Sequence, residues 1–229
     1  FNTSSHVPYV YNEGGENFYE VSDGTYVLTI DSKGVLTSGE RIVTGDIPLL
    51  TIPQKVGTTA VTGIKEGCFA PGDKGTLDYI KVLEVKDSSM TTIGNNVFKG
   101  ALKLEKIIIG NSVTTIGSGA FSECPVLTTA ELGSGITSIG NEVFKGSKQL
   151  ENITFASPAK GTVSFPLKNI GTDAFSTGGA KLTITGDAAA DYGPFVWSMQ
   201  PDNYMNKEDG VRVCYKTPSP SNFTIILDN

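Results

Sequence analysis

The chain has 229 residues, of which 38% are hydrophobic and 18% are charged, and its formal net charge is −6. This balance is typical of an ordered protein rather than a disordered one, and no run approaches the roughly 18 apolar residues of a membrane-spanning helix. Only two of the 18 basic residues are arginines, Arg41 and Arg212. The acidic balance argues against nucleic acid as a partner, because phosphate recognition needs a basic surface.

Residues 1–45 are predicted to form an N-terminal tail and a capping hairpin. Within residues 24–37, two apolar runs flank the turn-forming residues Asp31, Ser32, Lys33 and Gly34. A stack of repeats exposes the core of its terminal units, so a hairpin here would cover the first of them.

Residues 46–185 contain an internal repeat with a unit of 23 residues. In each unit an apolar residue is followed by two mostly polar ones, Ile, usually Gly, two further residues, a small apolar residue and Phe. The longer spacings in the Phe register, from Phe69 to Phe98 and from Phe144 to Phe175, place insertions at 70–75 and between Phe155 and Leu167. The register consists of Phe69, Phe98, Phe121, Phe144 and Phe175, preceded by Ile64, Ile93, Ile116, Ile139 and Ile170.

Each unit also contains an alternating apolar segment that predicts a strand. Leu104, Ile107 and Ile109 begin a pattern that recurs one unit later and again two units later. Stacked units would pair these strands at a spacing of about 4.8 Å and bring equivalent side chains into columns. The segment from Ile to Phe is too short for an independent helix and is predicted to form one helical or 3₁₀ turn, with the Gly permitting a backbone turn that a Cβ would hinder.

Residues 186–229 match no clear unit and are predicted to form an irregular C-terminal cap. Residues 211–215 and 223–227 are predicted closing strands, joined by a loop over 217–222. The preceding segment, 192–205, is rich in aromatic residues. Its aromatic side chains would cover the last unit, or alternatively Trp197 and Tyr204 would bind a sugar or a protein.

The sequence contains no catalytic or metal-binding constellation, and neither an enzymatic activity nor a cofactor is expected. His6 is the single histidine and lies in a polar tail, and the three cysteines, Cys68, Cys124 and Cys214, form no C-x-x-C pair. Cys68 occupies the small apolar position of its unit, so burial is expected. A parallel β-helix lyase is the enzymatic alternative, but the predicted outward strand positions lack its clustered acids and bases. That row comprises Thr51, Glu84, Ile108, Glu131, Thr154 and Thr183.

The repeat resembles the BspA-like branch of the leucine-rich repeats. Residues 113–121 and 136–144 match that pattern closely, Cys124 falls at the position of the family's cysteine, and the likeness extends over 46–185. The resemblance implies a mostly β, right-handed solenoid with β caps at both ends, on a secreted or surface-anchored bacterial protein. It also implies an adhesin that binds a host matrix or plasma protein, or another cell surface, and it carries no catalytic residues.

The resulting hypothesis is a non-catalytic extracellular binding module with no membrane span in this chain, in which no leader segment is visible. Its acidic charge predicts salt-sensitive contact with basic patches. A structural spacer and a glycan-binding solenoid using the C-terminal aromatics are the alternatives. The candidate binding residues are Val82, Glu84, Lys106, Ile108, Glu131, Thr154, Trp197 and Tyr204.

Overall fold

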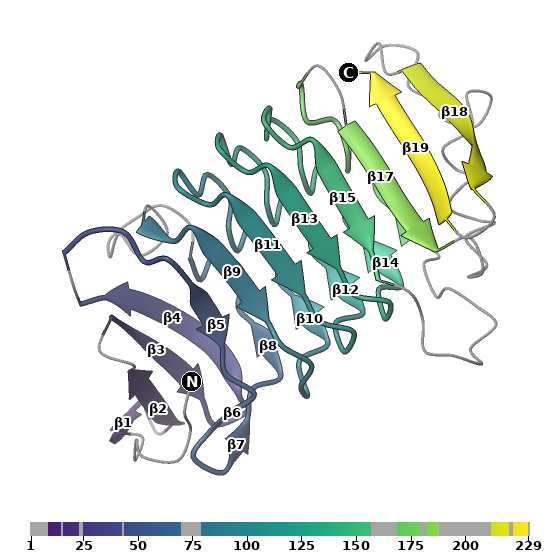
Figure 1. Ribbon diagram of the computed structural model, residues 1–229. Helices are drawn as coiled ribbons and strands as arrows, with labels where there is room; N and C mark the ends of the chain where they lie inside the picture. The colour runs from purple at the N-terminus through teal and green to yellow at the C-terminus, as the bar shows by residue number, and fades with distance from the viewer. Residues whose placement is uncertain are drawn as a thin grey trace.

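The computed structural model shows a mostly β solenoid whose rungs follow one another along the chain (Figure 1). Both predicted insertions and the aromatic segment 192–205, with Trp197 and Tyr204, lie outside the described residues. The structure describes residues 9–14, 16–22, 25–42, 44–69, 79–156, 169–179, 182–187, 212–219 and 222–228.

The predicted strands of the repeat form one wall of the solenoid. Within the described residues this wall is an eight-stranded sheet, which is parallel from β5 (Leu50–Ile52) to β17 (Leu182–Asp187). Lys106 pairs with Thr129 and Thr129 with Asn152, each one repeat unit further along the chain. Inward and outward residues alternate along the four strands that begin at Val82, Lys106, Thr129 and Asn152, as expected of a sheet with one face on the core. Its strands in spatial order are β5 (Leu50–Ile52), β9 (Val82–Val85), β11 (Lys106–Ile109), β13 (Thr129–Leu132), β15 (Asn152–Phe155), β17 (Leu182–Asp187), β19 (Asn222–Asp228) and β18 (Arg212–Ser219).

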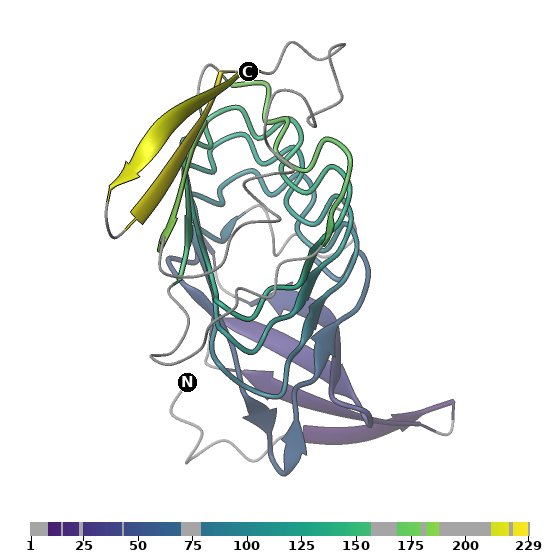
Figure 2. The ribbon, with the colours of Figure 1, turned by 90° about the vertical axis from the view of Figure 1, so that its right-hand side faces the viewer.

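A second sheet forms the opposite wall, and Figure 2 shows the two walls joined by turns. Its repeat strands are only two residues long, and each contains the isoleucine that precedes the Phe of its unit. A small separate hairpin pairs β6 (Lys55–Val56) with β7 (Thr59–Ala60). The second sheet comprises β1 (Tyr9–Glu13), β2 (Glu16–Ser22), β3 (Tyr26–Asp31), β4 (Val35–Arg41), β8 (Gly63–Ile64), β10 (Thr92–Ile93), β12 (Thr115–Ile116), β14 (Ser138–Ile139) and β16 (Asn169–Ile170).

The predicted N-terminal hairpin is present as β3 and β4, and it continues the second sheet. Strand β4 pairs in parallel with β8, which brings Leu36 opposite Ile64 and extends the isoleucine column by one residue. At Gly39 a Cβ would lie 2.1 Å from the Phe69 ring, so the missing side chain lets that ring pack directly on β4. Strands β1 and β2, which the sequence did not indicate, add to the outer edge of the hairpin by antiparallel pairing.

The predicted phenylalanine column is confirmed and forms the centre of the core. Adjacent rings are nearly parallel, with centroids 5.0 to 6.0 Å apart, and no ring is more than 2% exposed. Such offset stacking adds about 0.5–1.5 kcal/mol per pair to the burial of the rings. Five successive units are therefore bound together by one continuous aromatic stack.

The prediction of a helical turn between Ile and Phe is wrong. These segments form successive hydrogen-bonded turns, because the third residue after each Ile adopts a left-handed conformation that a helix does not contain. The freed amides donate instead to the next rung, as Phe98 N does to the carbonyl oxygen of Ala120 at 2.8 Å. The left-handed positions are Gly67, Asn96, Gly119, Glu142 and Asp173.

The glycine that follows the Ile in four of the five units is required for a different reason from the one expected. Its φ is not positive; instead, a Cβ at Gly140 would lie 2.5 Å from the backbone nitrogen of Ser118 in the preceding rung. Gly94, Gly117 and Gly171 show the same close approach. The glycine column therefore permits the tight stacking of rungs rather than the bending of one chain.

Both predicted C-terminal strands are present, and the predicted loop over 217–222 is wrong in its bounds. Strand β18 continues to Ser219 through an irregular register after Lys216, and β19 begins at Asn222. Because β19 pairs with β17 as well as with β18, the closing strands extend the eight-stranded sheet in an antiparallel direction.

Candidate functional site

The outward face of the eight-stranded sheet brings six of the predicted binding residues together. Two rows run across the strands, and the register pairs Glu84 with Ile108, Ile108 with Glu131, and Glu131 with Thr154. The first row contains Val82, Lys106, Thr129, Asn152 and Thr183, and the second contains Thr51, Glu84, Ile108, Glu131, Thr154 and Thr185.

The position predicted for Thr183 is wrong, because Thr154 pairs with Thr185. Thr154 and Thr185 pair between neighbouring strands and are 31 positions apart in the chain. Asn141 and Thr172, which contact each other between the turns of the same two rungs, are also 31 positions apart. The insertion therefore shifts the strand and the turn of its unit equally. Thr183 belongs instead to the first row, beside Asn152.

The charges on this sheet face are paired with one another. Lys106 Nζ lies 2.6 Å from Glu131 Oε1, on the neighbouring strand. Glu84 Oε2 lies 3.7 Å from Lys86 Nζ and accepts a hydrogen bond of 3.0 Å from the Thr51 hydroxyl. Val82 and Ile108 lie between these pairs and are half-buried. The face therefore offers apolar contact area surrounded by side chains whose positive and negative charges are paired.

Sequence reasoning missed Leu49, which extends the first row beyond Val82. Leu50 pairs with Leu83, so the preceding residue comes beside Val82, and its side chain is 45% exposed. The signal was present in the spacing Ile47–Leu50–Ile52, which repeats Ile80–Leu83–Val85 and makes Leu49 equivalent to Val82.

The turns carry a second feature, an open polar groove centred on the third repeat rung. There Gly119 and Ser122 take the positions that Asn96 and Lys99 hold in the preceding rung, so the smaller side chains leave a notch. Ion pairs border it, with Lys99 Nζ 3.4 Å from Glu123 Oε1.

The cation on the other side of this groove is also paired. Lys145 Nζ lies 2.7 Å from Glu142 and 3.4 Å from Asp173, and its hydrogen bonds to these two carboxylates raise the pKa of Lys145. A ligand would have to displace these acids to reach the ammonium group. The groove therefore offers hydroxyl and amide groups more than unpaired charge.

The cysteines behave as apolar packing groups. Burial raises the pKa of both the Cys68 and the Cys124 thiol to about 12, which leaves almost no reactive thiolate near neutral pH. Cys124 is fully buried and Cys68 packs half-buried against the core, so the burial expected of Cys68 is partial. The side chains of Cys214 and His6 lie outside the described residues.

The described residues show neither a metal-binding cluster nor a membrane-spanning helix. They contain no group of three or more His, Cys, Asp or Glu side chains placed to hold a metal ion. Across the same residues, no helix has the length and apolar character needed to cross a bilayer.

Solved structures with a similar chain path include bacterial proteins described as leucine-rich repeat or cell surface proteins. No curated protein matches the sequence. The pneumococcal vaccine antigen PcpA is 20% identical with a TM-score of 0.47, over 76% of this chain and 48% of its own. A leucine-rich cell surface protein of Faecalibacterium prausnitzii is 22% identical with a TM-score of 0.38, over 82% of this chain and 56% of its own. The leucine-rich repeat protein of T. pallidum is 16% identical with a TM-score of 0.42, over 66% of this chain and 81% of its own.

This chain therefore spans about half the length of the first two of these proteins. The sequence pattern of the BspA type leucine-rich repeat region matches six copies over residues 62–185, more than half of the chain. With the stacked phenylalanines and the parallel walls, this match shows that the chain belongs to the BspA-type leucine-rich repeat family.

Proposed function

We propose that this chain is a non-catalytic, protein-binding module of a bacterial cell-surface protein, and that it binds through the outward face of the eight-stranded sheet. The observation that carries the proposal is the position of Val82 and Ile108, half-buried between charge pairs on a continuous sheet. Repeat proteins use such extended faces for recognition, and an apolar centre with a polar rim is the usual anatomy of a protein interface.

The pairing of charges on this face changes the expected salt dependence. Glu84 and Lys106 already form ion pairs within the face, so the electrostatic potential of the face is weak although the chain as a whole is acidic. Contact with a partner depends mainly on shape and apolar area, and added salt weakens it only slightly. The family and the bacterial surface proteins of similar fold support an extracellular location, with a matrix protein, a plasma protein or another cell as the partner.

The proposal is tested by binding of the full chain to an array of extracellular-matrix and plasma proteins. Ile108→Lys places a charge at the centre of the face and is expected to weaken binding by about tenfold or more, as at other interface centres. Thr115→Lys, on the outward side of the opposite sheet, is the matched control and leaves binding unchanged. Saturable binding that Ile108→Lys does not affect contradicts the sheet-face site, and no binding to any protein favours the spacer alternative.

A further inference from the structure

A corner of the solenoid beside the sheet face carries an arginine that is held in place but has donors to spare. The guanidinium carbon of Arg41 lies 3.4 Å from the centre of the Tyr79 ring, and Arg41 Nη1 donates a hydrogen bond of 3.0 Å to the carbonyl oxygen of Gly45. A guanidinium has five N–H donors. Among the described residues, the Tyr79 ring and the carbonyl oxygen of Gly45 are the partners of the Arg41 guanidinium, so most of its donors remain available. Stacking fixes the plane of the group, which lowers the entropy lost when it binds a carboxylate in a bidentate manner.

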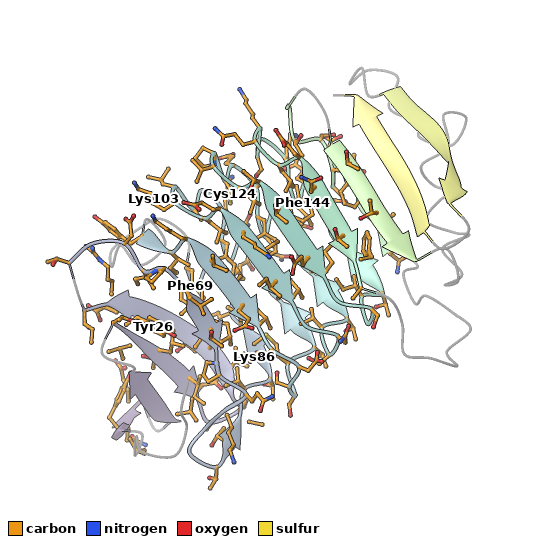
Figure 3. The ribbon with its side chains drawn as sticks, in the orientation of Figure 1. Tyr26, Phe69, Lys86, Lys103, Cys124 and Phe144 are labelled. Atoms are coloured by element: carbon orange, nitrogen blue, oxygen red, sulfur yellow. The ribbon has the colours of Figure 1, made fainter. Side chains whose placement is uncertain are left out.

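Segments distant in sequence meet at this corner. Ile47 N donates to the carbonyl oxygen of Tyr79 at 2.6 Å, and Lys81 N donates to that of Ile47 at 2.9 Å, so the chain before β5 runs along the chain before β9. In the next rung Glu105 N donates to the Lys81 carbonyl oxygen, which places Lys103 beside Tyr79. Figure 3 shows Lys103 on the edge where β9 and β11 begin, and Lys86 at the opposite end of β9.

Exposed apolar side chains gather in the same segments. Among the described residues four large hydrophobic side chains are exposed, and three of them, Ile42, Leu49 and Leu102, belong to the chain segments that meet here. Leu49 is 45% exposed and Leu102 is 53% exposed. Exposed aliphatic groups beside a tyrosine and an arginine are the composition of an interface hot spot.

The local charge is positive on an acidic chain. Lys81 and Asp46 form an ion pair of 3.2 Å, which cancels their charges, whereas Arg41 and Lys103 have no carboxylate partner among the described residues. The exposed Glu105, opposite Lys81 in the next rung, leaves one net positive charge among these side chains. This positive charge attracts an acidic group. The net charge of −6 opposes the approach of a second copy of the chain, so a different protein is the fitting occupant.

We propose that this corner, formed by Arg41, Tyr79, Leu49, Leu102 and Lys103, is a docking site for a protein segment in which a carboxylate stands next to an aliphatic side chain. The carboxylate binds the Arg41 fork, and the aliphatic group beside it packs against Leu102, which is next to Lys103 in the chain. The site extends the proposed function to a second surface, because Leu49 joins the corner to the sheet face.

The experiment selects a random-peptide display library on the full chain and measures the recovered peptides against variants. Recovered peptides are expected to contain Asp or Glu next to Leu, Ile, Val or Phe, and to lose binding when that acid is changed to its amide. Arg41→Lys keeps the charge but removes the fork, and Leu102→Ser removes apolar area; each is expected to weaken binding by about tenfold. Val10→Ser, at an equally exposed hydrophobic residue of β1, is the matched control.

Several results would overturn the proposal. These are a library that yields no binder, binders without the acidic and aliphatic pair, or binders that Arg41→Lys and Leu102→Ser do not affect. Dimerisation in sedimentation that Arg41→Lys abolishes would show that a second copy is the occupant. Ile108→Lys separates this site from the sheet face, since it is expected to leave peptide binding intact even where it abolishes binding of a whole protein.

Discussion

Replacing the central phenylalanine of the stack is the most direct perturbation of this fold. The Phe121 ring is fully buried, and its centroid lies 5.5 Å from that of Phe98 and 6.0 Å from that of Phe144. Truncation of a buried Phe to Ala costs about 3–5 kcal/mol. The loss of two ring pairs moves Phe121→Ala to the upper end of that range, about 5 kcal/mol of the free energy of unfolding.

A second variant separates ring contact from burial. Phe121→Leu keeps a large apolar side chain but has no ring, so it is expected to lose the two stacking contributions, about 1–3 kcal/mol together. Because neighbouring rungs stabilise one another, the central position should be more sensitive than Phe69, which has a ring on one side and the backbone of β4 on the other.

Urea unfolding followed by far-ultraviolet circular dichroism measures both variants. With a slope of about 3 kcal/mol per molar urea, Phe121→Ala should lower the midpoint by about 1.7 M. A loss below about 1 kcal/mol for Phe121→Ala would refute the view that the stack holds the rungs together. Equal losses for the Ala and Leu variants would show that ring contact contributes nothing beyond apolar volume.

Three further predictions follow from single contacts. Gly140→Ala places a Cβ against the backbone of the preceding rung and should lower stability in thermal melts by about 1–3 kcal/mol, whereas Gly63→Ala, whose Cβ would meet its nearest atom at 3.6 Å, should be tolerated far better. In the native chain the Ser147 hydroxyl donates a hydrogen bond of 2.8 Å to the buried carbonyl oxygen of Phe121. Ser147→Ala removes this donor and should lower the free energy of unfolding in urea by about 1–3 kcal/mol, and an unchanged midpoint would contradict this. Because burial raises the pKa of Cys124 to about 12, iodoacetamide at pH 8.5 should modify this thiol only after the protein unfolds, and rapid modification of the native protein in mass spectrometry would contradict this. The stability of the fold should also decrease from about pH 9 toward pH 12, because in this range the thiol loses its proton in the unfolded state but keeps it in the folded state.

The buried cysteine position illustrates how much the sequence conveys about the core. Cys124 and Ser147 occupy equivalent positions in adjacent units, and each side chain donates a hydrogen bond to the phenylalanine carbonyl oxygen of the preceding rung, from Cys124 to Phe98 and from Ser147 to Phe121. A repeat that equates these positions also equates their contacts, so one rung predicts the next. Cys124→Ser should accordingly be tolerated within about 1 kcal/mol.

The candidate binding surfaces were predictable to different degrees. The sheet-face row from Glu84 to Thr154 followed from the alternation of one strand and the repeat distance, and pairing confirms it. The corner around Arg41 and Tyr79 was not predictable, because these residues are far apart along the chain and lie in different structural units. Their contact depends on where the segment after β4 crosses from one wall to the other.

The sequence alone determined the repeat distance, the inward columns of Phe and Ile and the outward rows, because stacking makes each of them a function of spacing along the chain. The three-dimensional structure decided what one unit cannot specify. It replaced the expected helical turns with left-handed turns whose amides bond to the next rung, and it attributed the glycine column to contact between rungs. These features arise between rungs, where backbone groups from different units compete for the same space and the same hydrogen bonds.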